Sequence, residues 1–364
     1  MKRITKTAAL LIAVICVFSL VACTKSATVM SYKEYTVNEA YYTYWLSRFK
    51  ASFIDGYSDV EDTDEYYDSV ITDDGRTANE VMTELSDSII KNYLVCEYLC
   101  DYYGLKLTKN ILSQIDEELD AIVEGVADGS KNAFNGIAAQ YGVNLKMLRD
   151  IYIIETKSQL FYEFYASNYI TPSITDSARE AFLRDDYTRA DFIYISTEYE
   201  FLYDEDGNLD YSNDGDYRVP LTDEKKAEKL DLIAKIEGEI NSQNYLSLRE
   251  EHNEDPAKDV YPSGYYFNPD MQFDSEVISA LKEMTPAEIR KVETEHGVYF
   301  LRKLSVEPSA YAIEANADFF EDFETRLVRY LYNKMIEEEI ASVTFNDEVK
   351  KNITIKSVKP CYDF

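Results

Sequence analysis

Ala190-Asp191-Phe192-Ile193-Tyr194-Ile195 is rich in β-branched and aromatic residues and predicts a buried strand. A second stretch of the same kind, Gly297-Val298-Tyr299-Phe300-Leu301-Arg302, predicts a strand that closes the same domain. Between them, a helix is expected from Thr222 to Gln243. It should carry one apolar face, formed by Ala227, Leu230, Ile233, Ile236 and Ile240. Strand, helix and strand within one segment predict a small α+β domain.

Shorter motifs fill the space between these elements. They are Asn253-Glu254-Asp255-Pro256 after the helix, Ser263-Gly264-Tyr265-Tyr266, and Met271 followed by Phe273. In this order the segment resembles the parvulin family of peptidyl-prolyl isomerases, over roughly 115 residues. Parvulins usually carry a histidine in the first and in the last strand. Phe192 and Tyr299 stand at those two positions here.

The resemblance implies a small antiparallel sheet wrapped by helices, and a site on it. Asp255 would act on the carbonyl side of the substrate, with Tyr299 and Thr294 as hydroxyl donors. The proline pocket would be formed by Met271, Gln272, Phe273, Tyr266, Phe192 and Phe300. Isomerisation needs no nucleophile and no net proton transfer, only an apolar pocket that favours the twisted peptide bond. No cofactor and no metal are therefore expected.

A second interpretation of the same residues stays open. Phe192 and Tyr299 would then be core residues, Asp255-Pro256 a turn, and Met271 a side chain that fills a gap. The domain would be catalytically inactive and would keep only a binding groove. His252 and His296 flank the matched positions without occupying them, and neither has partners at metal-ligand spacing.

Residues 1–22 are expected to be an export signal. Lys2, Arg3 and Lys6 precede an apolar run that is too short for a confident membrane span. The run ends Leu20-Val21-Ala22-Cys23, which resembles the lipobox of bacterial lipoproteins, so Cys23 would be lipidated and residues 23–35 would form a tether. The alternatives are an ordinary cleaved signal and an uncleaved anchor. All three export the protein.

The net charge of the chain limits the kinds of partner that it can bind through charge. The chain of 364 residues has a formal net charge of −31, and removing residues 1–22 takes away three positive charges and leaves −34. Such acidity excludes binding to nucleic acid or to an anionic membrane face through charge. Basic unfolded clients would be attracted, although most acidic side chains are expected simply to face solvent.

The remaining chain is expected to be helical. Capping-box patterns at Thr36-Val-Asn-Glu39 and Thr77-Ala-Asn-Glu80 each predict the start of a helix. Further helices are expected at 108–126, 133–141, 144–169, 177–183 and 315–341, and an extended tail at 343–358. Cys96 and Cys100 lie four residues apart on one such helix and are expected to be small buried side chains.

The junction before the first strand, Ile174-Thr175-Asp176 and a short helix, resembles foldases of the PrsA and SurA type. The resemblance implies a helical chaperone-like domain from residues 36–186 and 309–364, with a parvulin-like domain inserted at 187–308. Within the latter, residues 199–220 form an acidic insertion with two Asp-Gly turn signals. Their Asp spacing hints at calcium, but turn chemistry is the simpler reading.

These patterns predict an exported, lipid-anchored foldase at the outer face of a bacterial membrane. Its partners would be unfolded or proline-containing secreted chains, and its isomerase activity is left open by the two replaced histidines. A catalytically inactive holdase or assembly scaffold is the main alternative. A solute-binding lipoprotein is a weaker one, because the alternating βαβ pattern of two-lobed binders is absent from the sequence.

Overall fold

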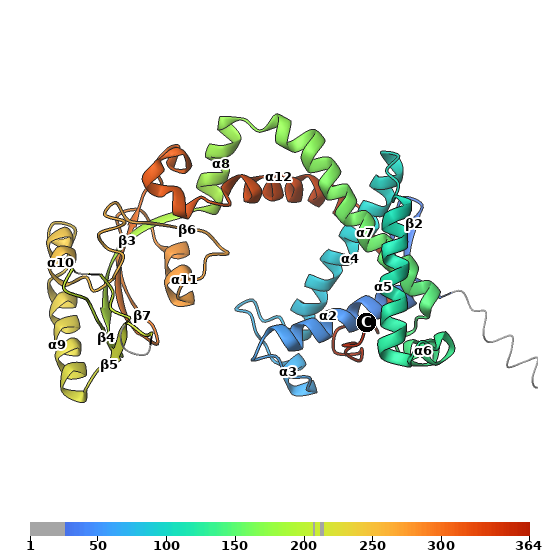
Figure 1. Ribbon diagram of the computed structural model, residues 1–364, viewed down its shortest axis with the longest axis horizontal. Helices are drawn as coiled ribbons and strands as arrows, with labels where there is room; N and C mark the ends of the chain where they lie inside the picture. The colour runs from blue at the N-terminus through green and yellow to red at the C-terminus, as the bar shows by residue number, and fades with distance from the viewer. Residues whose placement is uncertain (1–25, 207, 212–214) are drawn as a thin grey trace, which may run out of the picture. The chain divides into compact units, whose positions relative to one another are not determined.

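The computed structural model describes residues 26–206, 208–211 and 215–364 (Figure 1). The fold is α+β, as expected. The chain forms two compact units, one made of Met1–Pro172 and Leu331–Phe364, the other of Ser173–Tyr330. The expected domain limits at 187 and 308 both lie inside the second unit. The export signal and Cys23 lie outside the described residues.

The first unit is mainly helical. Its helices are α2 (Glu39–Gly56), α3 (Asp64–Asp68), α4 (Ala78–Tyr102), α5 (Lys109–Ala127), α6 (Lys131–Ala138) and α7 (Leu145–Tyr165), followed by the C-terminal α13 (Asp347–Lys350). Single turns are η2 (Ala139–Tyr141) and η3 (Ala166–Ile170), and η4 (Thr171–Ser173) leads into the second unit. The unit is held by a buried aromatic core that includes Trp45, Tyr42 and Phe161.

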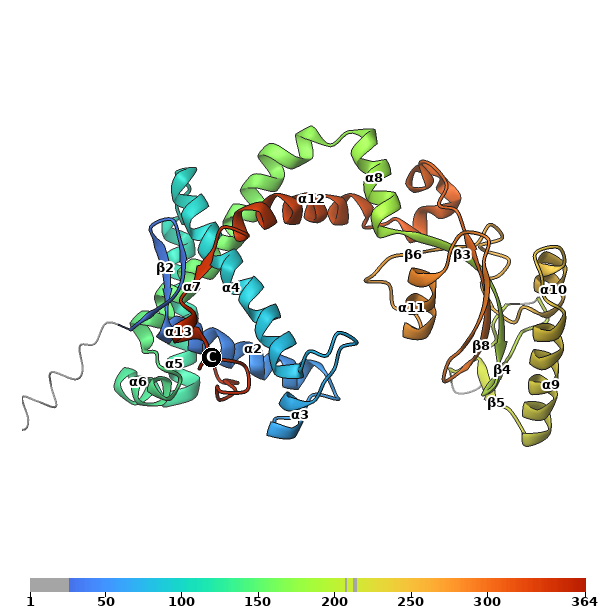
Figure 2. The same ribbon diagram turned by 180° about the vertical axis from the view of Figure 1, so that it is seen from behind.

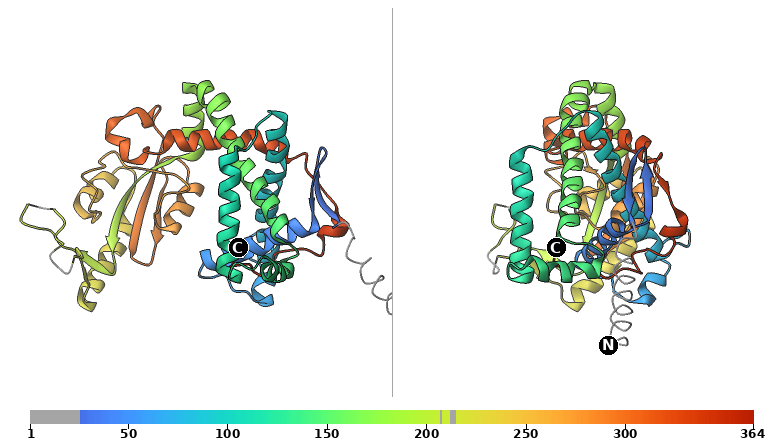
Figure 3. Two further views of the ribbon diagram at one scale, coloured as in Figure 1. Left: turned by 45° about the vertical axis from the view of Figure 1, so that its right-hand side comes forward. Right: turned by 90° about the vertical axis from the view of Figure 1, so that its right-hand side faces the viewer.

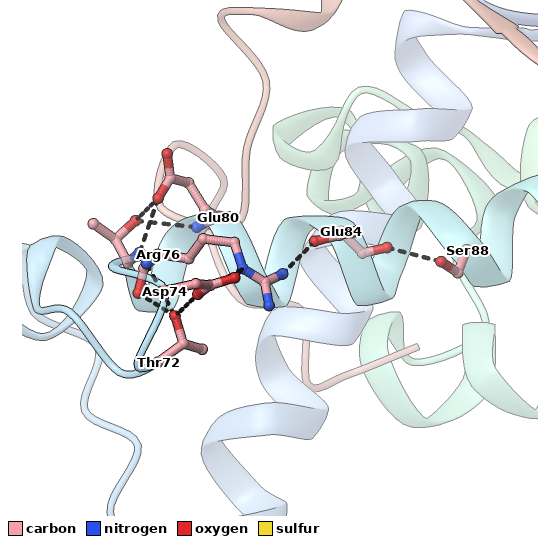
Figure 4. Close-up of polar contacts among 7 residues, drawn as sticks. Thr72, Asp74, Arg76, Glu80, Glu84 and Ser88 are labelled. Carbon is pink, nitrogen blue, oxygen red and sulfur yellow. Dashed lines mark hydrogen bonds and ion pairs between the residues drawn. The ribbon is translucent and has the colours of Figure 1, made fainter.

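The capping box at Thr77 is confirmed, because the Thr77 and Glu80 side chains each accept a hydrogen bond from the other's backbone N–H. Figure 4 shows how the network continues. Arg76 donates to Asp74 at 2.9 Å and to Glu84 at 2.7 Å, which fixes the preceding turn onto the first turns of α4. Helix α3 lies in the segment before this turn.

The capping box at Thr36 is wrong, since Thr36 lies in a strand and the side chain of Asn38 caps α2. The sequence interpretation missed a small antiparallel sheet here. Its order is β2-β1-β9, with bounds β1 Thr28–Tyr32, β2 Tyr35–Asn38 and β9 Thr344–Phe345 (Figure 2). The tail at 343–358 is expected to be extended, but only β9 within it is a strand. Helix α13 and turns follow β9.

Three cysteines of the first unit are free and buried, namely Cys96, Cys100 and Cys361. Cys96 lies 3.4 Å from the hydroxyl of Tyr332, and the Cys100 thiol donates to the Lys157 carbonyl at 3.2 Å. Burial raises the pKa of both thiols, which keeps them protonated. Cys96 and Cys100 therefore pack as small apolar side chains, as expected.

The second unit is built on one antiparallel sheet of order β6-β3-β8-β7. Its strands are β3 (Thr188–Ser196), β6 (Tyr265–Phe267), β7 (Ile289–Glu293) and β8 (Gly297–Leu304). Its helices are α8 (Asp176–Asp186), α9 (Asp223–Glu239), α10 (Tyr245–His252) and α11 (Ser275–Glu283). Helices α9 and α10 cover one face of the sheet, and α11 covers the other (Figure 1).

The two strands predicted from the sequence are confirmed as β3 and β8, which pair with each other from Arg189 to Ser196 and from Gly297 to Leu304. From Arg189 to Ser196 every residue of β3 is buried. Within the acidic insertion, β4 (Tyr199–Phe201) pairs with β5 (Arg218–Pro220), and the described residues between these strands form an arm that projects from the sheet (Figure 3).

Two helices of this unit differ from expectation. Helix α9 buries Ile233 and Ile236, but Leu230, assigned to the same face, is 58% exposed. The helix expected at 315–341 is α12, which runs only from Phe323 to Ile340 and is preceded by the turns η5 (Ala310–Ala312) and η6 (Glu314–Phe319). Its residues up to Tyr330 belong to this unit and those from Leu331 to the first. No helix in the described ranges is both long and apolar enough to cross a bilayer.

Candidate functional site

The four-stranded sheet has two different faces. Side chains alternate along a strand, so Phe192 and Tyr194 of β3 point to one side and Ile193 and Ile195 to the other. We name the first side the aromatic face, with the core residues Phe192, Tyr194, Tyr265, Phe267, Tyr299 and, partly buried, Met271 and Phe273. The second is the aliphatic face, with Ile193, Ile195, Ile233, Ile236, Val298 and Phe300 beneath α9 and α10.

The rings of the aromatic face form one continuous cluster. Phe192 stacks on Tyr265 with ring centroids 4.7 Å apart and meets Tyr299 edge-on at 5.3 Å. Tyr299 also contacts Tyr194 at 4.7 Å and Phe273 at 5.8 Å. Such pairs add to the stabilisation that burial alone gives. Phe192 and Tyr299, which replace the two family histidines, thus contact each other at the centre of this face.

A loop continues the sheet beyond β6. Strand β6 pairs with β3 only as far as Ala190, which leaves the rest of that edge of β3 without a strand partner. The loop Asn253–Asp255 covers it: the Tyr194 N–H donates to Asn253 Oδ1 at 2.9 Å, and the Glu254 N–H donates to the Tyr194 carbonyl at 2.9 Å. The Ser196 N–H donates to Glu254 Oε2 at 3.0 Å.

Two glycines of the matched motifs allow the close approach of backbones. At Gly264, φ is +93° and a Cβ would lie 2.7 Å from the Ala190 carbonyl oxygen. A Cβ at Gly297 would lie 2.4 Å from the Ile195 carbonyl oxygen. Any other residue at either position would push the neighbouring strand away.

The covering loop brings Asp255 to the edge of the aromatic face. Its carboxylate accepts a short hydrogen bond from the Tyr265 hydroxyl and one of 3.1 Å from the Ala257 N–H. Burial raises the pKa of the Asp255 carboxyl, while these hydrogen bonds and the charges of Arg249 and Lys258 act in the opposite direction. The result is a desolvated carboxyl group beside aromatic rings.

A second carboxylate, Asp274, lies at the start of α11 near the Tyr299 hydroxyl. Burial, and then the charge of Asp274, raises the pKa of Tyr299 far above its usual range. Tyr299 therefore remains a neutral hydroxyl. The charge of Asp255 also raises the pKa of Tyr299, so the Asp255 carboxylate lies close enough to this cluster to affect it.

The structure brings together Asp255, Tyr299, Phe192, Met271 and Phe273 of the predicted site. The other four predicted residues lie elsewhere, namely Tyr266, Gln272, Thr294 and Phe300. Phe300 lies on the aliphatic face because it neighbours Tyr299 on β8 and so points the opposite way. The Thr294 hydroxyl donates to the Gly297 carbonyl at 3.2 Å in the turn between β7 and β8.

Tyr266 packs over Arg189, with the guanidinium 5.5 Å from its ring centroid, instead of joining Tyr265 and Phe267. Gln272 is exposed. The sequence interpretation missed Tyr265, Tyr194 and Asp274. Had β6 been recognised, its alternation would have placed Tyr265 and Phe267 on one face and Tyr266 on the other.

No group of three His, Cys, Asp or Glu side chains within residues 26–206, 208–211 and 215–364 is arranged to hold a metal ion. Calcium binding by the acidic insertion stays a prediction, because residues 207 and 212–214 of the insertion lie outside the residues that the structure describes.

No protein-family model and no curated protein matches this chain. Solved structures similar to this chain include bacterial proteins described as foldases or as peptidylprolyl isomerases. They include PrsA from Bacillus subtilis, 19% identical, with 78% of this chain and 93% of that chain covered and a TM-score of 0.21.

Foldase protein PrsA from Streptococcus pneumoniae is 14% identical, with 90% of this chain and 98% of that chain covered and a TM-score of 0.23. Peptidylprolyl isomerase PrsA from Bacillus cereus is 14% identical, with 79% and 97% covered and a TM-score of 0.24. At these identities and scores, function has to be argued from the side chains of this chain.

Proposed function

We propose that the chain is an exported foldase whose second unit binds proline-containing segments of unfolded chains on the aromatic face. The observation that carries the proposal is the meeting of Asp255, from the covering loop, with Phe192 of β3 and Tyr299 of β8. Three segments far apart in the sequence thereby place a desolvated carboxyl group against a cluster of rings.

The chemistry of isomerisation fits these groups. The barrier to rotation about a peptide bond is about 18–20 kcal/mol, and uncatalysed X-Pro isomerisation takes tens to hundreds of seconds. Met271 and Phe273 are only partly buried and would contact the proline ring. The Tyr265–Asp255 pair would exclude water on the carbonyl side and stabilise the twisted bond, which has lost its amide resonance.

The proposal is tested by proline isomerisation with the full chain and a proline-containing peptide. Asp255→Ala and Met271→Ala are each expected to lower kcat/KM about tenfold, equivalent to about 1.4 kcal/mol of transition-state stabilisation. Gln272→Ala, one residue from Met271 but exposed, is the matched control and should keep the rate. An unchanged rate in both site variants would contradict the assignment.

A holdase without isomerase activity is the second candidate. It is favoured by the burial of Phe192 and Tyr299, which are only 2% and 8% exposed at the histidine positions. In the first unit, Tyr102 and Tyr169 are 69% and 47% exposed and both contact the ring of Tyr103. Exposed rings of this kind can hold apolar segments of an unfolded client.

The same protein preparations separate the two candidates. A wild-type rate no higher than background, together with suppressed aggregation of an unfolded client, would identify the holdase.

The anchor is proposed from the sequence alone: Cys23 would carry a lipid that holds the protein at the outer face of the membrane. Mass spectrometry of the protein extracted from membranes should then find the N-terminal peptide beginning at a lipid-modified Cys23.

A further inference from the structure

A separate hollow of about 240 Å³ lies in the second unit, where the end of α8, the start of β3, the end of β6 and the helix α11 meet. We name it the α11 hollow. Its apolar wall consists of Tyr187, Phe267, Pro269, Ile278 and Leu281. It shares Phe267 and Leu281 with the core of the aromatic face, but none of Asp255, Met271 and Tyr299 lines it.

Three cations line the same hollow, namely Arg184, Lys282 and Lys303. The Lys303 ammonium donates to Thr188 Oγ1 at 2.6 Å and to the Leu281 carbonyl. Burial lowers the pKa of Lys303, so its charge is poorly compensated by solvent. Arg184 and Lys282 form no ion pair with any side chain in the part of the chain that the structure describes.

The carboxylates of the hollow are already engaged. Asp186 forms an ion pair of 2.6 Å with Arg326, and Asp185 accepts a hydrogen bond of 2.5 Å from the Tyr330 hydroxyl. The chain has 68 acidic and only 37 basic side chains, yet three cations line this one small hollow.

From this arrangement we propose that the α11 hollow binds a carboxylate group that sits next to an apolar side chain. The cations would donate charge-assisted hydrogen bonds to the carboxylate, and the apolar wall of Phe267, Ile278 and Leu281 would contact the apolar side chain. Pockets for drug-sized ligands occupy about 300–1,000 Å³, so the smaller hollow suits a single amino-acid residue. A polypeptide offers this chemistry at its free C-terminus, or at an Asp or Glu beside an apolar residue.

Three labelled pentapeptides distinguish these sources when titrated against the full chain by fluorescence anisotropy. The first ends in leucine with a free carboxylate, the second is the same peptide amidated, and the third is amidated but carries an internal Glu beside leucine. The free acid is expected to bind at least ten times more tightly than its amide. Equally tight binding of the Glu peptide would show that the hollow accepts a side-chain carboxylate as well as a C-terminal one, whereas weak binding would assign the carboxylate to the C-terminus.

Variants locate the binding. Lys303→Met and Arg184→Gln should each weaken binding of the preferred peptide at least tenfold. Arg184 is exposed, so its replacement leaves the core intact if Lys303→Met disturbs folding. Lys226→Met is the control, because Lys226 pairs with Glu198 at 2.8 Å and does not line the α11 hollow. The proposal is overturned if neither carboxylate peptide binds better than the amide, or if Arg184→Gln binds like the wild type.

Discussion

The two faces of the four-stranded sheet are built by alternate residues of the same strands, yet they differ in chemistry. The aliphatic face is closed by α9 and α10 and consists mainly of Ile and Val side chains, with Ile193, Ile195 and Ile236 fully buried. The aromatic face mixes rings with hydroxyl and carboxyl groups, and Met271 and Phe273 stay partly buried. One face therefore mainly stabilises the unit, and the other retains the groups that could act on a ligand.

The aliphatic side also contains a buried ion-pair network. Asp191, which is 2% exposed, receives Arg249 of α10 at 2.6 Å and Arg302 of β8 at 3.0 Å. The guanidinium of Arg302 stacks 4.3 Å from the ring centroid of Tyr245, also in α10. The network fixes α10 to the sheet, and the covering loop with Asp255 follows directly after α10.

The largest expected effect comes from breaking this network. Asp191→Ala would leave two guanidinium groups in a buried site without their carboxylate, which costs roughly 3–5 kcal/mol of unfolding free energy. Urea denaturation of the full chain measures this loss in the transition of the second unit. Asp231→Ala, at an exposed position of α9, is the control and should stay within about 0.5 kcal/mol of the wild type. A loss below 1 kcal/mol for Asp191→Ala would show that the network does not hold α10.

A smaller loss is expected from the apolar contacts of the same face. Ile236→Ala removes a fully buried side chain and should cost about 3 kcal/mol. Leu230→Ala on the same helix removes a side chain that is 58% exposed, and it should change the unfolding free energy by less than about 1 kcal/mol. Equal losses in the two variants would mean that α9 does not pack on the sheet through Ile236.

The sequence predicted those strands of this sheet that can be recognised from their own residues. Strands β3 and β8 are long runs of β-branched and aromatic residues, and both were found. Strand β6 has only three residues, too few to show a period, so the opposite directions of Tyr265 and Tyr266 could not be foreseen. Thr36 shows a related limit, because its pairing with Ser31 in the adjacent strand β1 overrides its capping-box pattern.

The sequence predicted only part of the site, and the reason is the same. Alternation along β8 separates Tyr299 from Phe300, and the sequence interpretation placed both in one pocket. Asp255 was found through its motif, but its partner Tyr265 depends on where β6 lies beside β3. Such contacts arise from the register of the sheet and not from the local sequence.

The smallest expected effect belongs to the aromatic face and concerns the protonation of Asp255. Burial raises the pKa of its carboxyl group above the unfolded value of about 3.9, so the folded protein holds this proton to a higher pH than the unfolded chain does. The stability that protonation provides is fully present below the unfolded pKa and is lost as pH rises through the folded pKa.

Asp255→Asn isolates this contribution, because the amide cannot ionise. The unfolding free energy of the wild type minus that of Asp255→Asn should fall as pH rises from about 3.5 to 7. Parallel denaturation series at each pH measure the difference, and Asp231→Asn, which is exposed, serves as the control with little pH dependence of its own. A difference that grows with pH would mean that the Tyr265 hydroxyl and the nearby cations outweigh burial, and that the aromatic face presents a stabilised carboxylate in place of a desolvated one.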